Sequence, residues 1–410
     1  MKKVVVIGGG ASGLMAAYAA AKNGNHVRLI EQNEKLGKKI YITGKGRCNV
    51  TNDVPAGEFL SSVVHNAKFL NGCIYSFPPE KMKEFLEDHG TKLKTERGNR
   101  VFPISDHASD ITKALEKACK NAGVIIHLNE KVLDLSVINS TMSDVITTKG
   151  RYECDCAVVC TGGLSYPTTG STGDGYEFAK KAGHSVGELY PALTGITLQG
   201  SDFSKLQGLS LKNVVLTARR GEKNIYSAMG EMLFTHYGVS GPLVLTLSSQ
   251  IARENVKDIT LTLDLKPALD ETKLDNRILR DFDEGKNKII SNVLHALLPS
   301  KLIDFVLKEA NIAANKQVNA VTKAERLRLV HALKFYPLYP VALRGFGEAI
   351  ITSGGIDVKQ INPKTMESKL VKGLYFCGEA LDVDAYTGGF NLQIAFSTAV
   401  LAGENAAWGE

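Results

Sequence analysis

The sequence contains no apolar run of eighteen or more residues, which excludes an ordinary membrane-spanning helix. Its apolar N-terminal stretch is interrupted by glycines and lacks a small-residue cleavage site, so we expect no signal peptide. Low-complexity linkers and internal repeats are also absent. The 44% hydrophobic and 22% charged fractions are typical of globular proteins, and 410 residues are too many for one ordinary core. We therefore predict a cytoplasmic enzyme of two or three domains.

The seven cysteines have neither the even count nor the regular spacing of a disulfide framework. Cys154-x-Cys156 has no second Cys or His pair nearby at zinc-finger spacing, so we expect no metal site. A cytoplasmic protein also keeps its thiols reduced. We expect most of these side chains to fill the core on strands: Cys48, Cys73, Cys119, Cys154, Cys156, Cys160 and Cys377.

Charge of one sign is not in large excess, since the formal net charge is +6. Basic residues nevertheless gather in two stretches, the second followed by aromatic residues: Lys205, Lys212, Arg219, Arg220 and Lys223, then Lys323, Arg326, Arg328, Lys334 and Arg344 with Phe335, Tyr336 and Tyr339. Cations beside exposed aromatic rings bind phosphates and stack on bases, which would suit RNA. A solvated helix face beside a buried aromatic turn explains the same pattern.

What the chain does contain is a dinucleotide-binding pattern at its N-terminus. Residues 3–13, KVVVIGGGASG, predict a buried strand, a glycine turn and an Ala-rich helix. Gly8 allows the tight turn, Gly10 lets the backbone approach a pyrophosphate, and Gly13 lets helix and strand pack closely. The next strand ends at Glu31, eighteen residues after Gly13, where a carboxylate accepts ribose hydroxyls and repels the extra phosphate of NADP.

The C-terminal stretch 373–403 predicts the other half of the same pocket. It contains a strand, the Gly378-Glu379 turn, a loop, and a small-residue helix that opens at residues 388–391. The N-terminal dipole of that helix would stabilise an anionic reduced flavin ring. No second G-x-G-x-x-G follows a strand, so a separate nicotinamide domain is not expected, and NAD(P)H would have to visit the flavin transiently.

The order of segments predicts an α/β fold that is interrupted by an insertion. Strands alternate with helices in the first part, short β-like runs follow Pro191, and a helical period begins near Asp270. Thr322-x-x-Glu325 predicts a capping box for the last inserted helix. We therefore expect a Rossmann-like FAD-binding domain at 1–191 and 341–410, a β-barrel-like domain at 192–268 and a small helical domain at 269–340.

Five stretches together are similar to the BaiN/RdsA-type flavoproteins, an aminoacetone-oxidase-like FAD-binding family: 37–52, 161–184, 230–245, 351–358 and 374–395. The resemblance is colinear and covers essentially the whole chain. It implies an FAD-binding domain interrupted by a β-barrel and a helical domain. It also implies reduction of a conjugated C=C bond, either in a uracil of large-subunit ribosomal RNA to give dihydrouridine or in a 3-oxo bile-acid intermediate.

By this resemblance, the loop GKGRCN (44–49) lies along the cofactor next to the flavin ring. Lys45 and Arg47 would balance the charge of the pyrophosphate or of the reduced flavin ring. Glu379 would bond ribityl or phosphate-adjacent hydroxyls, although similar flavoproteins often carry Asp at its position. The cofactor contacts implied in total are Gly8, Gly10, Ala11, Ser12, Gly13, Glu31, Gln32, Lys38, Lys39, Thr43, Gly44, Gly46, Arg47, Cys48, Asn49, Lys131, Val132, Thr161, Gly162, Gly163, Gly378, Glu379, Asp384, Gly389, Phe390, Asn391, Leu392 and Gln393.

Three residues are candidates for the catalytic proton donor. Cys48 lies beside Lys45 and Arg47, which are expected to lower the pKa of its thiol; its alternative role is a packed thiol that contacts FAD. His236 lies in a Gly-rich stretch of the insertion, where a lone histidine is more often structural. Tyr386 is expected in the wall of the substrate cavity.

Hypotheses of three classes remain open at this point: an FAD-dependent enzyme, a non-catalytic RNA-binding flavoprotein, and a structural α/β protein that would be colourless and unable to take up FAD. The leading hypothesis is an FAD-dependent reductase of a uracil in ribosomal RNA. A reductase of a small enone such as a steroid is the alternative, followed by a flavin amine oxidase. A non-catalytic RNA-binding flavoprotein belongs to another class and would keep its flavin oxidised in the presence of NAD(P)H.

Overall fold

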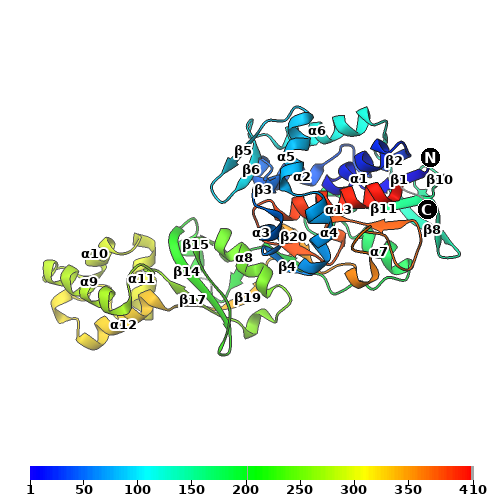
Figure 1. The fold of residues 1–410 in the computed structure, drawn as a ribbon. Coiled ribbons are helices and arrows are strands. Elements are labelled where there is room, and N and C mark those ends of the chain that lie inside the picture. The colour runs from blue at the N-terminus through cyan, green and yellow to red at the C-terminus, as the bar shows by residue number, and fades with distance from the viewer. Residues whose placement is uncertain (201, 408–410) are drawn as a thin grey trace. The chain divides into compact units, whose positions relative to one another are not determined.

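The computed structural model describes residues 1–200 and 202–407, which divide into two compact units. The first unit contains Met1–Pro191 and the chain from Phe346 onward, and the second contains Ala192–Gly345 (Figure 1). The chain therefore leaves the first unit once and re-enters it a few residues after the expected boundary at residue 341. The segments 192–268 and 269–340, expected as separate domains, lie in one unit.

A five-stranded parallel sheet forms the centre of the first unit, in the order β21-β11-β1-β2-β7. Its strands are β1 (Lys3–Ile7), β2 (His26–Ile30), β7 (Ile125–His127), β11 (Cys156–Val159) and β21 (Leu374–Phe376). The strands β1 and β11 are almost completely buried apolar runs, as expected of strands covered on both faces. This architecture confirms the predicted α/β class with a Rossmann-like parallel sheet.

The two ends of the chain pack together through α1 (Ala11–Lys22) and α13 (Phe390–Ala407), which lie side by side in Figure 1. Both helices present small residues to each other. A Cβ added at Gly403 would lie 2.4 Å from the carbonyl oxygen of Ala16 and 2.9 Å from Cβ of Ala19. Only glycine fits this contact, so the small residues of the two helices set their close approach.

The remaining elements of the first unit are short. Its other helices are α2 (Lys38–Ile42), α3 (Ala56–Leu60), α4 (Asn71–Ser76), α5 (Pro79–Asp88), α6 (Ala108–Asn121) and α7 (Asp174–Lys181). Its small sheets contain β3 (Thr51–Asn52), β6 (Arg100–Pro103) and β5 (Leu93–Glu96); β10 (Arg151–Glu153), β9 (Thr141–Thr147) and β8 (Val132–Ile138); β4 (Val63–His65) with β22 (Asp384–Ala385); and β12 (Tyr190–Ala192) with β20 (Ile351–Ser353). The strands β7 and β8 are separated by a turn that places Asn129 in the left-handed region.

The second unit is built on a seven-stranded sheet in which every pair of neighbouring strands is antiparallel. In sheet order, its strands are β18 (Tyr336–Leu338), β17 (Thr260–Asp264), β14 (Ser210–Arg220), β15 (Lys223–Thr235), β16 (Gly238–Ser240), β13 (Ile196–Leu198) and β19 (Pro340–Leu343). Its helices are α8 (Pro242–Ile251), α9 (Glu271–Glu284), α10 (Ile290–Val293), α11 (Ser300–Glu309) and α12 (Lys323–Lys334).

One hydrophobic core holds this second unit together. Leu263 of the sheet, Leu274 of α9, Leu302 of α11 and Leu329 of α12 belong to the same buried cluster. The helices bury their apolar faces in the core that the sheet also lines, so the β and helical segments share one compact unit. The capping box of α12 predicted from Thr322 and Glu325 is confirmed. None of the helices in the described ranges is long and apolar enough to cross a bilayer.

Candidate functional site

A cavity lies at the carboxyl ends of β1, β2 and β11 in the first unit. Its empty volume is about 1290 Å³, part of which is open to solvent. The first turns of α1 and α13 both border it, so residues from the two ends of the chain line one cavity. This position at the carboxyl edge of a parallel sheet is where doubly wound folds bind their ligands.

The cavity is lined by more than half of the predicted cofactor contacts: Gly8, Gly10, Ala11, Ser12, Glu31, Gln32, Lys38, Lys39, Thr43, Lys131, Val132, Thr161, Gly162, Glu379, Asn391 and Leu392. The other predicted contacts are not among its lining residues: Gly13, Gly44, Gly46, Arg47, Cys48, Asn49, Gly163, Gly378, Asp384, Gly389, Phe390 and Gln393.

The three glycines of the fingerprint differ in the space that a side chain would have at each position. Gly8 has φ +102°, and a Cβ there would lie 2.7 Å from the carbonyl oxygen of Cys160. A Cβ at Gly13 would lie 1.7 Å from the carbonyl oxygen of Gly8. At Gly10 a Cβ would meet nothing within 4 Å, and no side chain caps α1. The first turn of α1 therefore lines the cavity without a side-chain cap, which suits a pyrophosphate site.

Glu31 follows β2 and is only 7% exposed. One carboxylate oxygen accepts a hydrogen bond from the backbone N–H of Gly9 at 2.6 Å, and the other accepts from the backbone and side chain of Asn33 at 2.8 and 2.6 Å. These bonds fix the carboxylate at the cavity wall. A carboxylate offers about four lone-pair sites, so the bonds leave capacity for a ribose hydroxyl.

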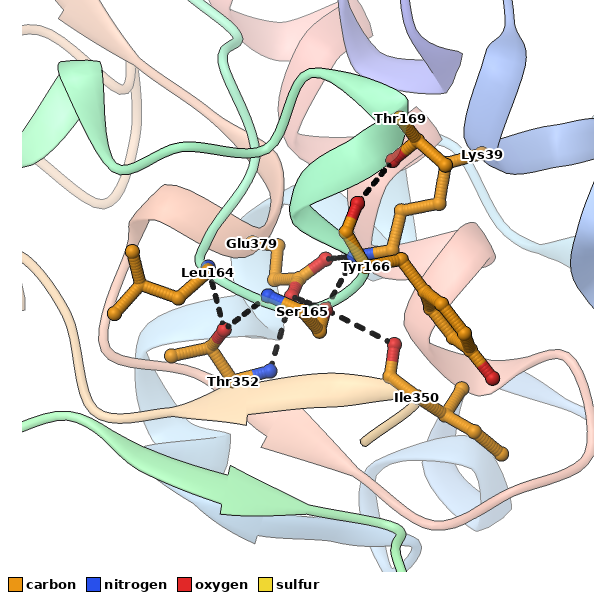
Figure 2. Close-up of polar contacts among 8 residues, drawn as sticks. All are labelled: Lys39, Leu164, Ser165, Tyr166, Thr169, Ile350, Thr352 and Glu379. Atoms are coloured by element: carbon orange, nitrogen blue, oxygen red, sulfur yellow. Dashed lines mark hydrogen bonds and ion pairs between the residues drawn. The ribbon is translucent and has the colours of Figure 1, made fainter. Parts of the chain in front are cut away.

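A second polar cluster joins four segments of the first unit at the cavity (Figure 2). Glu379 lies in the single turn Gly378–Ala380, and its Oε2 accepts from Nζ of Lys39 at 2.7 Å. Its Oε1 accepts from the hydroxyl of Ser165 at 2.8 Å and from the backbone N–H of Thr352 at 3.0 Å. The Thr352 hydroxyl in turn accepts from the backbone N–H groups of Leu164 and Ser165.

The Lys39–Ser165–Thr352–Glu379 cluster holds the Glu379 carboxylate in place through bonds to the protein. Both oxygens of the carboxylate bind protein groups, and the side chains of Lys39 and Glu379 are 22% and 20% exposed. Such an arrangement positions an ammonium group at the cavity wall. The expected contact of Glu379 with ribityl hydroxyls stays a prediction. No local pattern singled out Ser165 or Thr352, although both lie inside stretches that carry the family resemblance.

The first turn of α13 is held at the cavity by Asn391. Its Oδ1 accepts from the backbone N–H of Ala385 at 2.9 Å, and its Nδ2 donates to the Ala385 carbonyl at 2.8 Å. Gly389 has φ +96°, and a Cβ there would lie 2.4 Å from the carbonyl oxygen of Thr51. Gln393 accepts from the Thr51 hydroxyl and donates to the Phe77 carbonyl, so its amide is engaged by the protein.

The GKGRCN loop has an unusual backbone, since Gly44, Lys45, Gly46 and Cys48 all have positive φ. The Arg47 guanidinium pairs with Glu96 and with Asp106, and it lies 4.2 Å from the ring centre of Phe102. The hydrogen bond from Arg47 lowers the pKa of the Glu96 carboxyl group, and the hydrogen bonds from Lys94 and then Arg47 lower the pKa of Asp106. The positive charge of Arg47 is therefore balanced by Glu96 and Asp106, and Arg47 does not line the cavity.

The expected lowering of the Cys48 pKa is wrong. Cys48 is 0% exposed, and burial raises the pKa of its thiol to about 12, outweighing its hydrogen bond with Thr43. Burial penalises the thiolate, and the nearby cations do not compensate because Arg47 is paired with carboxylates and Lys45 is exposed. Cys48 therefore takes the alternative role of a packed thiol.

The other two candidate proton donors lie in different units. Tyr386 is half-buried in the first unit, and its backbone N–H donates to the Ser62 carbonyl at 3.0 Å. Its carbonyl accepts from Asn391, which ties the tyrosine to the first turn of α13. His236 is exposed in the turn between β15 and β16 of the second unit, with its ring 5.0 Å from that of Tyr237.

One histidine–carboxylate pair was missed by sequence reasoning. Nδ1 of His65 on β4 lies 2.5 Å from Oδ1 of Asp384 on β22. The Asp384 side chain is 1% exposed and the His65 side chain 26%. The two residues are 319 positions apart, so no local pattern could pair them.

The two basic stretches have different surroundings. In the second, Arg326 pairs with Asp275 at 2.7 Å, Arg328 donates to the Ala310 carbonyl, and Lys334 pairs with Asp264. In the first, Arg220 pairs with Glu254. The exposed side chains of Lys212, Arg219 and Lys223 remain on the hairpin formed by β14 and β15. In the described part of the chain, no cluster of three or more His, Cys, Asp or Glu residues could hold a metal ion.

Comparison with known proteins finds relatives over the whole length of the chain. A family model described as HI0933-like protein Rossmann domain matches residues 2–405. A 3-dehydro-bile acid delta(4,6)-reductase of Clostridium scindens is 32% identical over 414 residues, which cover 99% of each chain. A ribosomal RNA dihydrouridine synthase of Haemophilus influenzae is 31% identical over 403 residues, which cover 96% of each chain.

Solved structures show the same fold at lower sequence similarity. The 3-ketosteroid-delta4-(5alpha)-dehydrogenase from Rhodococcus jostii RHA1 is 14% identical, with a TM-score of 0.54 over 100% of this chain and 97% of that one.

Proposed function

The chain belongs to the HI0933-like protein Rossmann-domain family, and from that premise we propose that it is an FAD-dependent oxidoreductase that reduces a C=C bond conjugated to a carbonyl. The observation that carries the proposal is the single cavity bordered by the first turns of α1 and α13. The whole-chain match confirms the family resemblance seen in the sequence.

The residues of the cavity fit FAD. The uncapped first turn of α1 and the open space at Gly10 suit the pyrophosphate. Glu31 suits the adenosine ribose, and Asn391 at the opposite chain end suits the flavin side. Mass analysis of the cofactor released from the purified protein tests this assignment: we expect FAD, and FMN would contradict it.

FAD, when bound, supplies a hydride from its reduced ring to one carbon of the double bond. The chain's own residues must hold the carbonyl, exclude water and deliver a proton to the other carbon. We propose Tyr386 and His236 for the proton, because the Cys48 thiol has no exposed surface. NAD(P)H is the proposed electron donor, in a transient encounter with the flavin.

The leading substrate is a uracil in large-subunit ribosomal RNA. A relative named ribosomal RNA dihydrouridine synthase is 31% identical across nearly the whole chain, and the β14–β15 hairpin exposes cations suited to a polyanion. A small enone such as a 3-oxo bile-acid intermediate is the second candidate, favoured by the relative named 3-dehydro-bile acid delta(4,6)-reductase.

Mapping dihydrouridine in large-subunit ribosomal RNA of a deletion strain tests the leading substrate. We expect the loss of one or more modified positions and their return on complementation with the wild-type chain, but not with Gly10→Val, which places a side chain in the pyrophosphate site. An unchanged dihydrouridine map, together with anaerobic reduction of a 3-oxo-4-ene steroid, would instead support the small enone.

The same purified protein separates an enzyme from a non-catalytic RNA-binding flavoprotein. Anaerobic NAD(P)H is expected to bleach the flavin absorption band, and the substrate is expected to restore it. A flavin that stays oxidised in excess NAD(P)H while the protein still binds RNA would support the non-catalytic alternative.

A further inference from the structure

Two buried cysteines face each other at the end of the central sheet. Cys160 follows β11 and Cys377 follows β21, and these strands are parallel neighbours with Val159 paired to Phe376. The register therefore places the two cysteines side by side. Their Sγ atoms are 3.1 Å apart, and both residues are free thiols. Neighbouring strands are about 4.8 Å apart, which is within the Cα separation that disulfides tolerate.

The two thiols differ in access. Cys160 lines the cavity and is 4% exposed, whereas Cys377 is 0% exposed and is not a lining residue. A reagent that enters the cavity therefore meets Cys160 first, with Cys377 directly behind it. Burial raises the pKa of the Cys160 thiol, so we expect peroxide to oxidise it slowly.

Cys160 also lies against the glycines that shape the pyrophosphate site. Its carbonyl oxygen occupies the space that a Cβ at Gly8 would need, at 2.7 Å. Its Cβ lies 3.4 Å from the position of a Cβ at Gly13. A shift of Cys160 therefore moves the turn that carries the first N–H groups of α1.

We propose that Cys160 and Cys377 are an oxidative modification site, at which a peroxide converts the two thiols to a disulfide and thereby blocks cofactor loading. Peroxide transfers an oxygen atom to the Cys160 sulfur and departs as water. The Cys377 thiol then displaces the hydroxyl of the sulfenic acid, which leaves as a second water. The thiols lose two hydrogen atoms in total, and the peroxide is reduced.

The geometry predicts how the disulfide and the cofactor exclude each other. Closing the bond brings the sulfurs from 3.1 Å to about 2.05 Å, and we expect the accompanying shift of Cys160 to disturb its contact with Gly8. A dinucleotide in the cavity covers Cys160 and keeps peroxide from it. This protection rests on the proposed function, but disulfide formation without cofactor does not.

The test uses the full-length chain treated with hydrogen peroxide at limiting and at saturating FAD, followed by alkylation, digestion without reductant and mass spectrometry. We expect a peptide that links Cys160 to Cys377 at limiting FAD and its absence at saturating FAD. The oxidised protein is expected to bind FAD about tenfold more weakly, and dithiothreitol is expected to reverse the change.

Three variants separate this site from general oxidation. Cys377→Ser removes the second thiol, so peroxide is expected to leave Cys160 sulfinic acid that dithiothreitol does not reverse; Cys377→Ala serves the same purpose if the serine destabilises the sheet. Cys73→Ser, at a buried thiol on α4, is expected to behave like the wild type. Intact Cys160 and Cys377 thiols after peroxide at limiting FAD would overturn the proposal, whether or not FAD is later found to be the cofactor. Equal linkage at saturating FAD would overturn the proposed exclusion.

Discussion

At the residue scale, substitutions of two fingerprint glycines should distinguish an effect on folding from an effect on cofactor binding. Gly13 has no room for a Cβ, whereas Gly10 has open space and a backbone conformation, φ −81° and ψ −165°, that alanine adopts. We expect Gly13→Ala to lower the melting temperature of the cofactor-free protein. Gly10→Ala is expected to leave that temperature unchanged and to weaken FAD binding about tenfold. Thermal unfolding and FAD titration of both variants check this contrast.

Equal loss of stability in the two variants, or unchanged FAD binding by Gly10→Ala, would contradict the assigned steric roles. Gly345→Ala provides a control, because its φ is not in the left-handed region, a Cβ there meets nothing within 4 Å, and it lies in the second unit. It is expected to change neither the melting temperature nor FAD binding.

Also at the residue scale, the Lys39–Glu379 pair is partly buried and shares the Ser165 hydroxyl. Removing one partner leaves a polar group without its ion pair, so Lys39→Met and Glu379→Gln should each cost about 1–3 kcal/mol. The double variant should cost less than the sum, with a coupling of about 1 kcal/mol. The matched cycle Lys180→Met and Glu177→Gln, an exposed pair at 2.9 Å, should show a coupling below about 0.5 kcal/mol. Equal couplings in the two cycles would argue against a structural role for the first pair.

At the element scale, the capping box of α12 predicts a pH dependence. The hydrogen bond from Lys316, followed by that from the Thr322 backbone, lowers the pKa of Glu325 to about 2. Because the folded pKa is below the unfolded one, this stabilisation is complete above about pH 4.3 and is lost as the pH falls towards 2. Glu325→Gln should therefore lower stability by about 0.5–1 kcal/mol at neutral pH, and the difference from wild type should narrow in acid. Thermal unfolding against pH checks this, with Asp304→Asn on α11 as the exposed control.

The wild type and Glu325→Gln could also keep a constant difference in stability from neutral to acidic pH. That result would show that the carboxylate charge is not the source of the stabilisation.

The β14–β15 hairpin is the second prediction at this scale. Because Lys212, Arg219 and Lys223 are exposed there, reversing the three charges to Glu should weaken RNA binding about tenfold or more and reduce its salt dependence. Lys113, Lys117 and Lys120 on α6 provide a matched triple reversal in the first unit that should leave RNA binding unchanged. Arg326 and Arg328 are unsuitable as probes because they bond Asp275 and Ala310, so their reversal should reduce stability instead. RNA binding that tolerates the hairpin reversal would remove the hairpin from the interface.

At the scale of the whole molecule, short-range and long-range features differ in how far the sequence could predict them. The glycine turn, the helix cap at Thr322 and the parallel sheet follow from local spacing, and the structure has all three. The Lys39–Glu379 and His65–Asp384 pairs join residues 340 and 319 positions apart, and only the folded topology brings them together.

Burial is the other property that local spacing could not supply. The sequence places Cys48 between cations, but its thiol is fully buried, and Arg47 is taken up by Glu96 and Asp106. Likewise, the apolar faces of the inserted helices were visible in the sequence, but not that they share the core of the neighbouring sheet. Sixteen of the predicted cofactor contacts therefore line one cavity, whereas the role of each side chain there stays a prediction.

The central claim is that the two ends of the chain bind one FAD. Hydrogen–deuterium exchange of the full-length protein with and without FAD measures this directly, peptide by peptide. We predict that FAD protects both the segment 8–14 at the start of α1 and the segment 388–395 at the start of α13, with similar FAD concentration dependence. Protection of the first segment alone, or of neither, would contradict the account.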